Sequence, residues 1–450
     1  MGQTIQVVSY RNYWKIYIEI ALLTLLCVSQ YFAITALNLL LTGAILLLHL
    51  SMSDLEECTI GLFCALPEFN LLNIRIGSIS LYYLMVFIFW LRYFQYHNWR
   101  ISKVKFMVLF ILLVIRLTSG EIESTLTWFV LLSVLVLTYG EDFFDQNLQN
   151  VVLFTSIVFI LSSLAGYLML QGGKSIYMKG TVWSDGVMSI RFAGIIGDAV
   201  FFSQACALFV AANLTLGCTN RRYLFPALII SGTITVLCLE SYAKTGIILL
   251  ILVFISALLW LIWNRLKSKR TAVLSILLAF FSILAVFWAI NYVLTNTENP
   301  IIQNYIVRFS SDDLLTGRGE IWKHYVELLA GSWRSLFCAL PQSKFTSPFV
   351  LSNGRYFRDT HNVYLEMLCM FGLIATLCML VFVFVLMYRC LIHRKGILWL
   401  MPICVMLASG FSLHGNLEFH YYTLIAIALS FMRCNTFYRT QISSDIATHA

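Results

Sequence analysis

The chain has 450 residues, of which 60% are hydrophobic and only 12% are charged, and its formal net charge at pH 7 is +8. Soluble domains carry about a quarter charged residues, so this composition excludes a soluble globular enzyme, a disordered chain and a disulfide-stapled secreted module. At roughly 20 apolar residues per span, the length accommodates about a dozen membrane helices. We therefore predict an all-α, polytopic membrane protein whose positive charge reports orientation and not nucleic-acid binding.

Long apolar stretches follow one another along the chain, without the alternation that the strands of a membrane barrel show. Since only helices or closed barrels satisfy backbone polar groups in lipid, each stretch is a candidate transmembrane helix. The stretches lie at 14–32, 34–50, 77–95, 104–118, 123–139, 150–171, 193–216, 223–240, 245–263, 272–294, 364–388, 396–412 and 417–432. We expect about twelve spans, arranged as an N-terminal transmembrane bundle (1–294), a large loop (295–363) and C-terminal membrane helices with a cytoplasmic tail (364–450).

Basic residues gather in every second connection between these stretches, and an excess of Lys and Arg marks cytoplasmic loops. The clusters are Arg100, Lys103 and Lys105; Arg221 and Arg222; Arg265, Lys267, Lys269 and Arg270; Arg389, Arg394 and Lys395; and, at the end, Arg433 and Arg439. The connections 172–192, 240–245 and 295–363 must then face the other side. Two helices between 14 and 50 break this alternation. The sequence leaves open whether they form one long span or a half-span, or whether a later stretch does not cross.

The cysteines give no sign of a metal site. They lie mostly inside the apolar stretches, where a thiol packs as a small hydrophobe. No CxxC pair and no His/Cys metal spacing is present, so we predict neither a metal nor another cofactor. Cys58 and Cys64 share one predicted loop; they either remain unpaired or form a disulfide if that loop faces the oxidising side.

The large loop at 295–363 is long for a compact protein, and loops of this length are usually functional or disordered. It is not low in sequence complexity. Within it, Ile321, Tyr325, Leu328 and Leu329 recur at helical spacing. We therefore expect this loop to contain helices that lie on the outer surface of the membrane.

Ionisable residues inside or beside spans are costly, so each is a candidate functional residue. On the side opposite the basic loops, Arg191 and Lys244 lie at span ends. Arg318 lies in the large loop, and His361 lies where that loop re-enters the membrane. Taken singly, a cation at a helix end often only snorkels to the interface, a lone His is often structural, and Asp198 would be a simple polar contact between helices. Taken together, guanidinium groups match phosphate oxygens and an imidazole suits proton abstraction near neutral pH, which predicts a site for a hydroxyl nucleophile and a phosphate leaving group.

A series of motifs runs through the same region in a fixed order. They are Arg191-Phe192-x-Gly194, a Ser241…Thr245-Gly246 turn, Gly317-Arg318-x-x-Ile321-Trp322 in the large loop, His361-Asn362-x-Tyr364-Leu365, and Gly372. In this order and with this loop, the sequence resembles the O-antigen polymerase and O-antigen ligase family of bacterial inner membranes. The resemblance covers about residues 185–380.

The resemblance implies a metal-independent glycosyltransferase in the bacterial inner membrane, with its site at the periplasmic face and a glycan on undecaprenyl diphosphate as donor. It implies that Arg191 and Arg318 hold the diphosphate, and that His361 orients or deprotonates the acceptor hydroxyl; these three are the predicted catalytic residues. Cations already positioned where negative charge develops in the transition state make a large contribution to catalysis in such reactions. The predicted substrate-binding residues are Lys244, Asn362 and Asp198, with Asn362 as a partner that fixes the His tautomer. The implied partners are the lipid-linked oligosaccharide, the bilayer, a chain-length regulator and a flippase, with no nucleic acid.

Two departures from the family pattern bear on the choice between its activities. Ligases often carry an Arg in a Thr-Arg-Ala-type turn where this chain has Lys244, and Lys supplies charge without the bidentate fork. The segment Cys338-Ala339-Leu340-Pro341-Gln342 replaces a Gly-rich stretch often seen midway through the loop. We therefore favour the polymerase, which joins one lipid-linked repeat unit to another, over the ligase, which transfers the finished chain to lipid A-core. A transporter of lipid-linked sugars is a third alternative, disfavoured because no internal repeat is found and the charges gather at one face.

Overall fold

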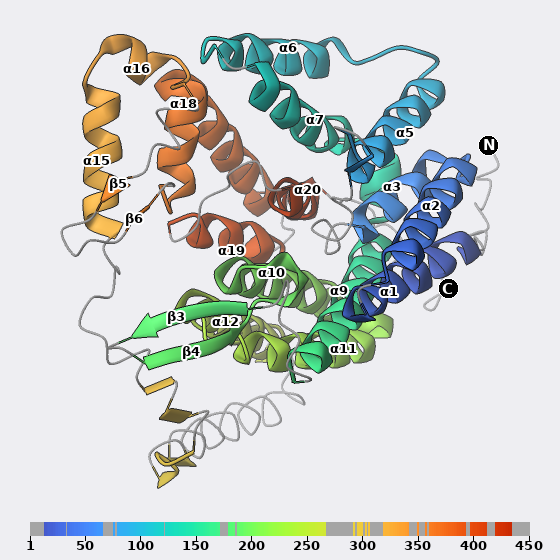
Figure 1. Ribbon diagram of the computed structural model, residues 1–450, viewed down its shortest axis with the longest axis vertical. Helices are drawn as coiled ribbons and strands as arrows, with labels where there is room; N and C mark the ends of the chain where they lie inside the picture. Colours follow the sequence, from blue (N-terminus) through green and yellow to red (C-terminus); the bar gives the residue numbers. More distant parts are fainter. Residues whose placement is uncertain are drawn as a thin grey trace.

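The computed structural model shows a largely helical chain with short two-stranded antiparallel hairpins (Figure 1). It describes residues 13–32, 34–65, 75–76, 79–120, 122–171, 179–184, 187–266, 291–292, 295–299, 302–303, 305–306, 318–341, 349–350, 356–357, 360–392, 397–411 and 419–433. All structural statements below refer to these residues.

The elements keep the labels of Figure 1. The first half of the chain forms α1 (Trp14–Phe32), α2 (Thr35–Ser51), α3 (Leu55–Cys64), β1 (Arg75–Ile76), β2 (Ile79–Ser80), α5 (Leu81–Tyr96), α6 (Lys103–Leu117), α7 (Ile122–Thr138), α8 (Asp142–Gln146) and α9 (Leu148–Gln171). The second half forms β3 (Lys179–Ser184), β4 (Val187–Phe192), the 3-10 turn η2 (Gly194–Ile196), α10 (Ala199–Thr219), α11 (Arg221–Leu239), α12 (Lys244–Leu266), α15 (Arg318–Ala330), α16 (Trp333–Phe337), β5 (Phe349–Val350), β6 (Tyr356–Phe357), α18 (Val363–Ile392), η3 (Ile397–Leu400), α19 (Met401–Ser409) and α20 (Phe419–Arg433).

Five helices in the described part of the chain are long and apolar enough to cross a membrane: α9, α10, α11, α12 and α18. Shorter apolar helices accompany them, at Thr35–Ser51, Trp128–Thr138, Ile397–Ser409 and Tyr421–Arg433. The prediction of a helical membrane protein is therefore confirmed, whereas the number of about twelve spans stays a prediction. The predicted stretch at 272–294 lies almost entirely outside the described residues.

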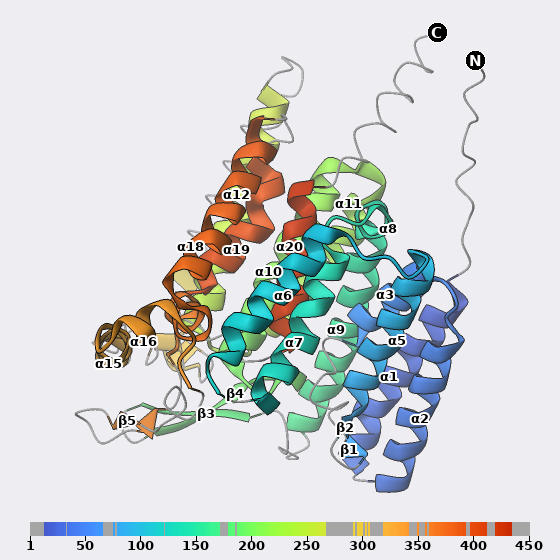
Figure 2. The same cartoon turned by 90° about the horizontal axis from the view of Figure 1, so that it is seen from above.

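The helices share a common direction, and the two ends of the bundle differ (Figure 2). One end, called here the terminal end, carries both chain termini. The other, the hairpin end, carries the β3–β4 hairpin with α15 and α16, which lie across the bundle and not along it. The connections from α5 to α6 and from α10 to α11, both predicted to be basic loops on one side, lie toward the terminal end. The predicted helices in the large loop are present as α15 and α16.

The N-terminal helices explain why the sequence alternation fails near residue 50. α1 and α2 are separate helices packed against each other, so the alternative of one long span is wrong. They are followed by α3, a helix of only 10 residues in which every side chain is buried. The segment that we predicted as a loop is thus a half-length helix inside the bundle, and its Cys58 and Cys64 are both free thiols. Its acidic start misled the prediction, because Glu56 accepts a 2.7 Å hydrogen bond from the Tyr13 hydroxyl instead of facing solvent.

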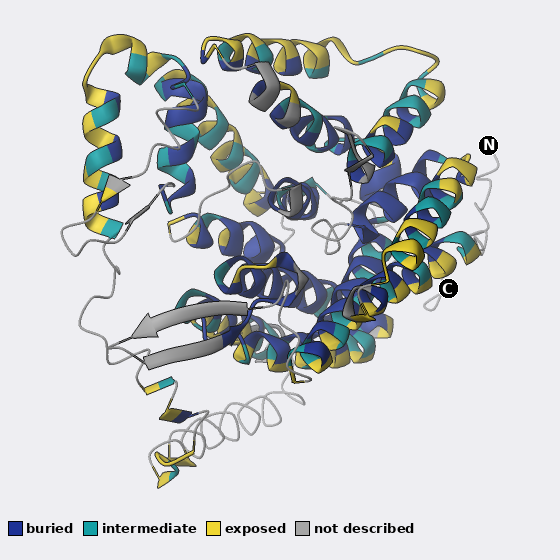
Figure 3. Ribbon diagram, viewed as in Figure 1, coloured by how far each residue is buried: buried dark blue, intermediate teal, exposed yellow. Residues whose placement is uncertain are grey.

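The core centres on α10, in which 94% of the residues of the most apolar segment are buried (Figure 3). It packs against α9, α11, α12 and α19, whereas only 28% of the residues in the most apolar segments of α12 and of α18 are buried. Such exposure fits helices whose outer sides face lipid tails. α10 therefore packs directly against α12, the helix that begins at Lys244.

A break at Gly372 divides α18 into two parts. The residue has a φ of 74° and a ψ of 172°, which no other residue of this helix adopts, and a Cβ at this position would overlap the carbonyl group of Phe337. Glycine is required there because it tolerates positive φ and lets the end of α16 approach the helix backbone. As a result the first part of α18 lies beside α15 across the hairpin end, while the second part runs with the bundle (Figures 1 and 2).

Candidate functional site

Arg191 is a buried side chain near the end of β4, 5% exposed. Its Nε donates a 2.9 Å hydrogen bond to the carbonyl oxygen of Ser241, in the turn between α11 and α12. The backbone N–H of Phe192 donates to the carbonyl of Glu240 at 3.1 Å. Since Lys244 begins α12 directly after this turn, the structure brings the segments of Arg191 and Lys244 together, although 50 residues separate Arg191 from Ser241.

The α11–α12 turn is also held from the large loop. The Tyr305 ring lies 4.9 Å from the Tyr242 ring, and the Tyr305 hydroxyl donates to the carbonyl of Leu239. Tyr242 itself has a positive φ of 49°. Burial raises the pKa of the neighbouring Glu240 carboxyl above its ordinary value of 4.5. Sequence reasoning missed Tyr305, because no motif marks a tyrosine that makes its contacts through a long loop.

Asp198 caps a helix. Its Oδ1 accepts hydrogen bonds from the backbone N–H groups of Val200 at 2.7 Å and Phe201 at 3.0 Å, as an N-cap of α10 does. The residue is exposed. This geometry gives Asp198 a structural role, and its predicted part in substrate binding stays a prediction.

His361 and Asn362 form the entry to α18. His361 is half-buried and has a φ of 47°, in the left-handed region. The buried Asn362 caps the helix, since its Oδ1 accepts from the N–H groups of Tyr364 at 2.9 Å and Leu365 at 3.2 Å. Thr360 completes the turn by donating to the Asn362 carbonyl at 2.9 Å. Asn362 Oδ1 therefore fixes the backbone next to His361. The predicted role of Asn362 in fixing the tautomer of the His361 imidazole stays a prediction.

Two contacts attach this entry to the core. The N–H of Val363 donates to the carbonyl of Gly410 at 2.8 Å, just after α19. In the preceding turn, the Ser409 hydroxyl accepts a hydrogen bond from the side-chain amide of Gln204 on α10. The start of α10 is in turn close to α12, because a Cβ on Gly246 would overlap the Ser203 side chain. α10 thus links the first turn of α12, which begins at Lys244, with the turn that carries His361.

Arg318 is the first residue of α15, a helix that packs on α18. It shares a helical stripe with Tyr325 and Leu329 at the spacing of packed positions, and both of these side chains are buried with Ile321 against Cys369 of α18. α15 and the first part of α18 run in the same direction, since both end beside α16 (Figure 1). Arg318 and His361 therefore lie at the starting ends of two neighbouring parallel helices.

The segments that carry the six predicted site residues lie at or next to the starts of α10, α12, α15 and α18 and the end of β4, and these element ends lie toward the hairpin end (Figure 2). Direct contacts join the segments of Arg191 and Lys244, whereas His361 and Asn362 are neighbours in the sequence. That these side chains act on one substrate remains a prediction. Within the described residues, no group of three or more His, Cys, Asp or Glu side chains is arranged to hold a metal ion.

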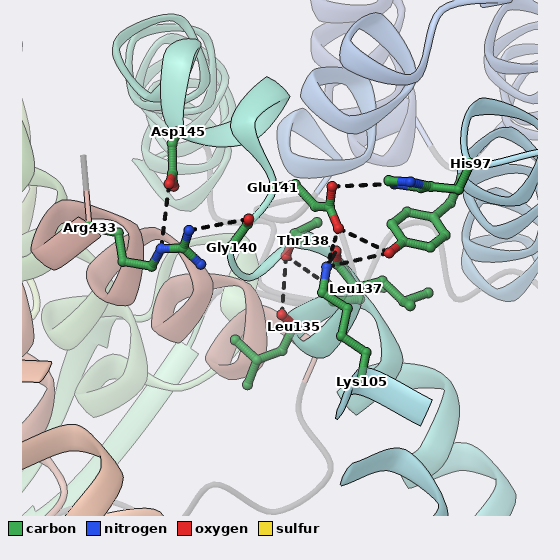
Figure 4. Close-up of polar contacts among 11 residues, drawn as sticks. His97, Lys105, Leu135, Leu137, Thr138, Gly140, Glu141, Asp145 and Arg433 are labelled. Atoms are coloured by element: carbon green, nitrogen blue, oxygen red, sulfur yellow. Dashed lines mark hydrogen bonds and ion pairs between the residues drawn. The ribbon is translucent and has the colours of Figure 1, made fainter. Parts of the chain in front are cut away.

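A separate polar network occupies the terminal end (Figure 4). Glu141 pairs with Lys105 and lies 3.2 Å from Nε2 of His97. Arg433, at the end of α20, lies 3.6 Å from Asp145 and donates to the Gly140 carbonyl at 3.2 Å. The sequence predicted Lys105 and Arg433 only as orientation signals, and the structure shows that both also connect helices.

Comparison with known families supports the resemblance found in the sequence. Residues 227–380 match the family model described as O-antigen ligase. The resemblance to the O-antigen polymerase and ligase family is confirmed. The matched segment contains Lys244, Arg318, His361 and Asn362, whereas Arg191 and Asp198 precede it. A search of curated proteins and a search of solved structures each return no significant match.

Proposed function

We propose that this chain is an O-antigen polymerase, or a polymerase of a related surface polysaccharide, in the bacterial inner membrane. It would join repeat units carried on undecaprenyl diphosphate at the periplasmic face. The observation that supports the proposal is that the four distant segments which carry Arg191, Lys244, Arg318 and His361 all lie toward the end of the bundle opposite the termini. Basic connections predicted to be cytoplasmic lie toward the terminal end, and by the positive-inside rule we infer that the hairpin end faces the periplasm.

The proposed reaction needs only an acid–base group and positive charge. The acceptor hydroxyl oxygen attacks the anomeric carbon of the donor sugar, and the bond from that carbon to the diphosphate oxygen breaks. His361 accepts the hydroxyl proton. Undecaprenyl diphosphate leaves with the bonding electron pair, and Arg191 and Arg318 stabilise the charge that it gains.

Lys244 adds a third cation to this site, and no metal or other cofactor takes part in the proposal. The buried setting of Arg191 strengthens its attraction for an anion, because water screens the charge less there. Its Nε is bound to the Ser241 carbonyl, which fixes the direction of the guanidinium plane. A chain-length regulator and a flippase that delivers the lipid-linked units are the expected protein partners.

The alternative activity in the same family is that of the ligase. Deletion of the gene distinguishes the two on a lipopolysaccharide gel. Loss of a polymerase leaves core capped by a single repeat unit, whereas loss of a ligase removes all capped forms and leaves polymer on the carrier lipid. Normal long chains in the deletion strain would exclude both activities.

A transporter of lipid-linked sugars is the remaining candidate. Transporter sites lie near the bilayer midplane on interrupted helices, whereas the predicted residues here lie toward one end of the bundle. Purified protein that forms polymer from lipid-linked repeat units in detergent, where no membrane separates two compartments, supports the polymerase and excludes a purely transporting role.

A further inference from the structure

Three ionisable side chains meet in the interior of the N-terminal helices, away from the hairpin end. Glu19 of α1, His49 of α2 and Cys58 of α3 are each fully buried. The imidazole joins the other two groups: its Nε2 lies 3.4 Å from Cys58 Sγ, and its Nδ1 lies 3.8 Å from Glu19 Oε1. Among the described residues, neither carboxyl oxygen of Glu19 nor Nδ1 of His49 has a hydrogen-bond partner.

The backbone of α3 closes the cluster. A Cβ on Gly61 would overlap Glu19 Oε2 and would lie 3.2 Å from His49 Nδ1. The absence of a side chain at Gly61 thus leaves room for the carboxyl and the imidazole to face each other beneath α3. The half-length α3 therefore covers a carboxyl, an imidazole and a thiol in one place.

The charge of the cluster follows from its surroundings. An unpaired carboxylate in an apolar interior is strongly unfavourable. The nearest cation on α1, Lys15, is bound to the Ser51 carbonyl at 2.7 Å and lies 3.8 Å from Glu57, so it is engaged at the terminal end. A carboxylate and a neutral imidazole together carry one negative charge. The pair therefore has no net charge only when one additional proton is bound to either group.

Arg92 indicates where that proton lies. It donates to the Leu50 carbonyl at 2.9 Å, and it is close enough to act electrostatically on His49 and Cys58. Burial disfavours an imidazolium, and a neighbouring cation disfavours it further, so the proton belongs on the Glu19 carboxyl, and Nδ1 of a neutral His49 is the acceptor that faces it. The Nε2–H of that tautomer points to the Cys58 sulfur.

The other titratable groups near the cluster do not change this count. Cys64 on α3 and Tyr82 on α5 lie within electrostatic range of Glu19, and a thiol and a phenol are ordinarily uncharged at neutral pH. Glu56 is bound to the Tyr13 hydroxyl, and Glu57 lies next to Lys15.

We propose that Glu19, His49 and Cys58 form an intramembrane proton-binding site, which holds one exchangeable proton beneath α3. The bound proton keeps the cluster neutral and so favours the packing of α3 against α1 and α2. Its release leaves a buried negative charge and loosens that packing. The site is separate from the proposed polymerase site and does not depend on it.

Infrared spectroscopy of the purified full chain tests the position of the proton. At neutral pH the carbonyl stretch of a protonated carboxylic acid is expected in the wild-type protein and lost in Glu19→Gln, but retained in the control Glu327→Gln, which alters an exposed residue of α15. Retention of the full band in Glu19→Gln overturns the proposal. Cys58→Ser and Cys64→Ser, which keep Glu19, form a matched pair: only the first should shift the band, since only Cys58 contacts His49. A shift in neither, or an equal shift in both, contradicts the arrangement.

Counting protons gives a second measure. Unfolded Glu is deprotonated at about pH 7, so at that pH the wild-type protein should release one proton more on unfolding than Glu19→Gln does. Because the folded state binds this extra proton, the unfolding equilibrium constant of the wild type, divided by that of Glu19→Gln, should rise about tenfold per pH unit between about pH 5 and pH 7. Equal proton release from the two proteins refutes the site.

Discussion

Replacing Gly372 by alanine tests whether the break in α18 positions α15. A φ of 74° with a ψ of 172° is a conformation that costs a non-glycine residue about 1–3 kcal/mol. The Cβ would also overlap the Phe337 carbonyl, and overpacking of this kind costs about another 1–3 kcal/mol. We therefore expect Gly372→Ala to destabilise the contact between α16 and α18 by about 2–6 kcal/mol, while the rest of the bundle still inserts.

Tryptic cleavage after Arg334, which is exposed on α16, reports this contact in detergent. If cleavage requires local opening, 2 kcal/mol corresponds to a rate about 30-fold higher than in the wild-type protein. Gly232→Ala on α11 is the matched control, because a Cβ at this position meets no atom within 4 Å apart from its immediate neighbours on the helix. This substitution should leave the cleavage rate unchanged. Wild-type cleavage of Gly372→Ala would refute the reasoning, as would an equal increase in Gly232→Ala.

The remaining predictions concern the hairpin end. Arg318→Ala and His361→Ala should each abolish chain growth while the protein still inserts, as judged by a lipopolysaccharide gel and a membrane-fraction blot; long chains with either variant would remove that residue from the mechanism. Arg191→Lys should lower polymerisation at least about tenfold, because Lys lacks the planar fork that binds diphosphate, and in vitro rates measure this. Asn362→Ala removes the cap of α18 and should cost about 1 kcal/mol of stability, visible as a lower thermal midpoint, whereas Asn362→Asp should retain most of it. Burial raises the pKa of Glu240, so the folded protein holds the carboxyl proton more tightly than the unfolded chain does. The protein therefore loses stability as pH rises from about 4.5 through the raised pKa. Glu240→Gln should remove that part of the pH dependence of the thermal midpoint.

Hydropathy located most helices within a few residues, because a run of apolar side chains in lipid leaves the backbone no alternative to a helix. The helical spacing of Ile321 and Tyr325 likewise predicted α15 and its buried face. The order of motifs gave the family resemblance, which the family model at residues 227–380 supports, without any structural information. These features depend on residues that are close together in the sequence, so one amino-acid sequence is enough to predict them.

The features that escaped prediction depend on distant partners. α3 looked like a loop because its acidic start is charged, and only the structure shows Tyr13 bound to Glu56. The attachment of Arg191 to the Ser241 carbonyl joins residues 50 positions apart. The cluster of Glu19, His49 and Cys58 draws one residue from each of three helices, and no spacing in the sequence marks it.

The parallel arrangement of α15 and the first part of α18 has an electrostatic consequence beyond their side chains. The peptide dipoles of a helix leave about half a positive charge at its N-terminus, and here two such ends lie near each other, beside Arg318 and His361. This backbone field persists when a side chain is replaced. An Arg318→Ala protein should therefore still attract a diphosphate, although it does not turn it over, and the attraction should weaken as salt is added.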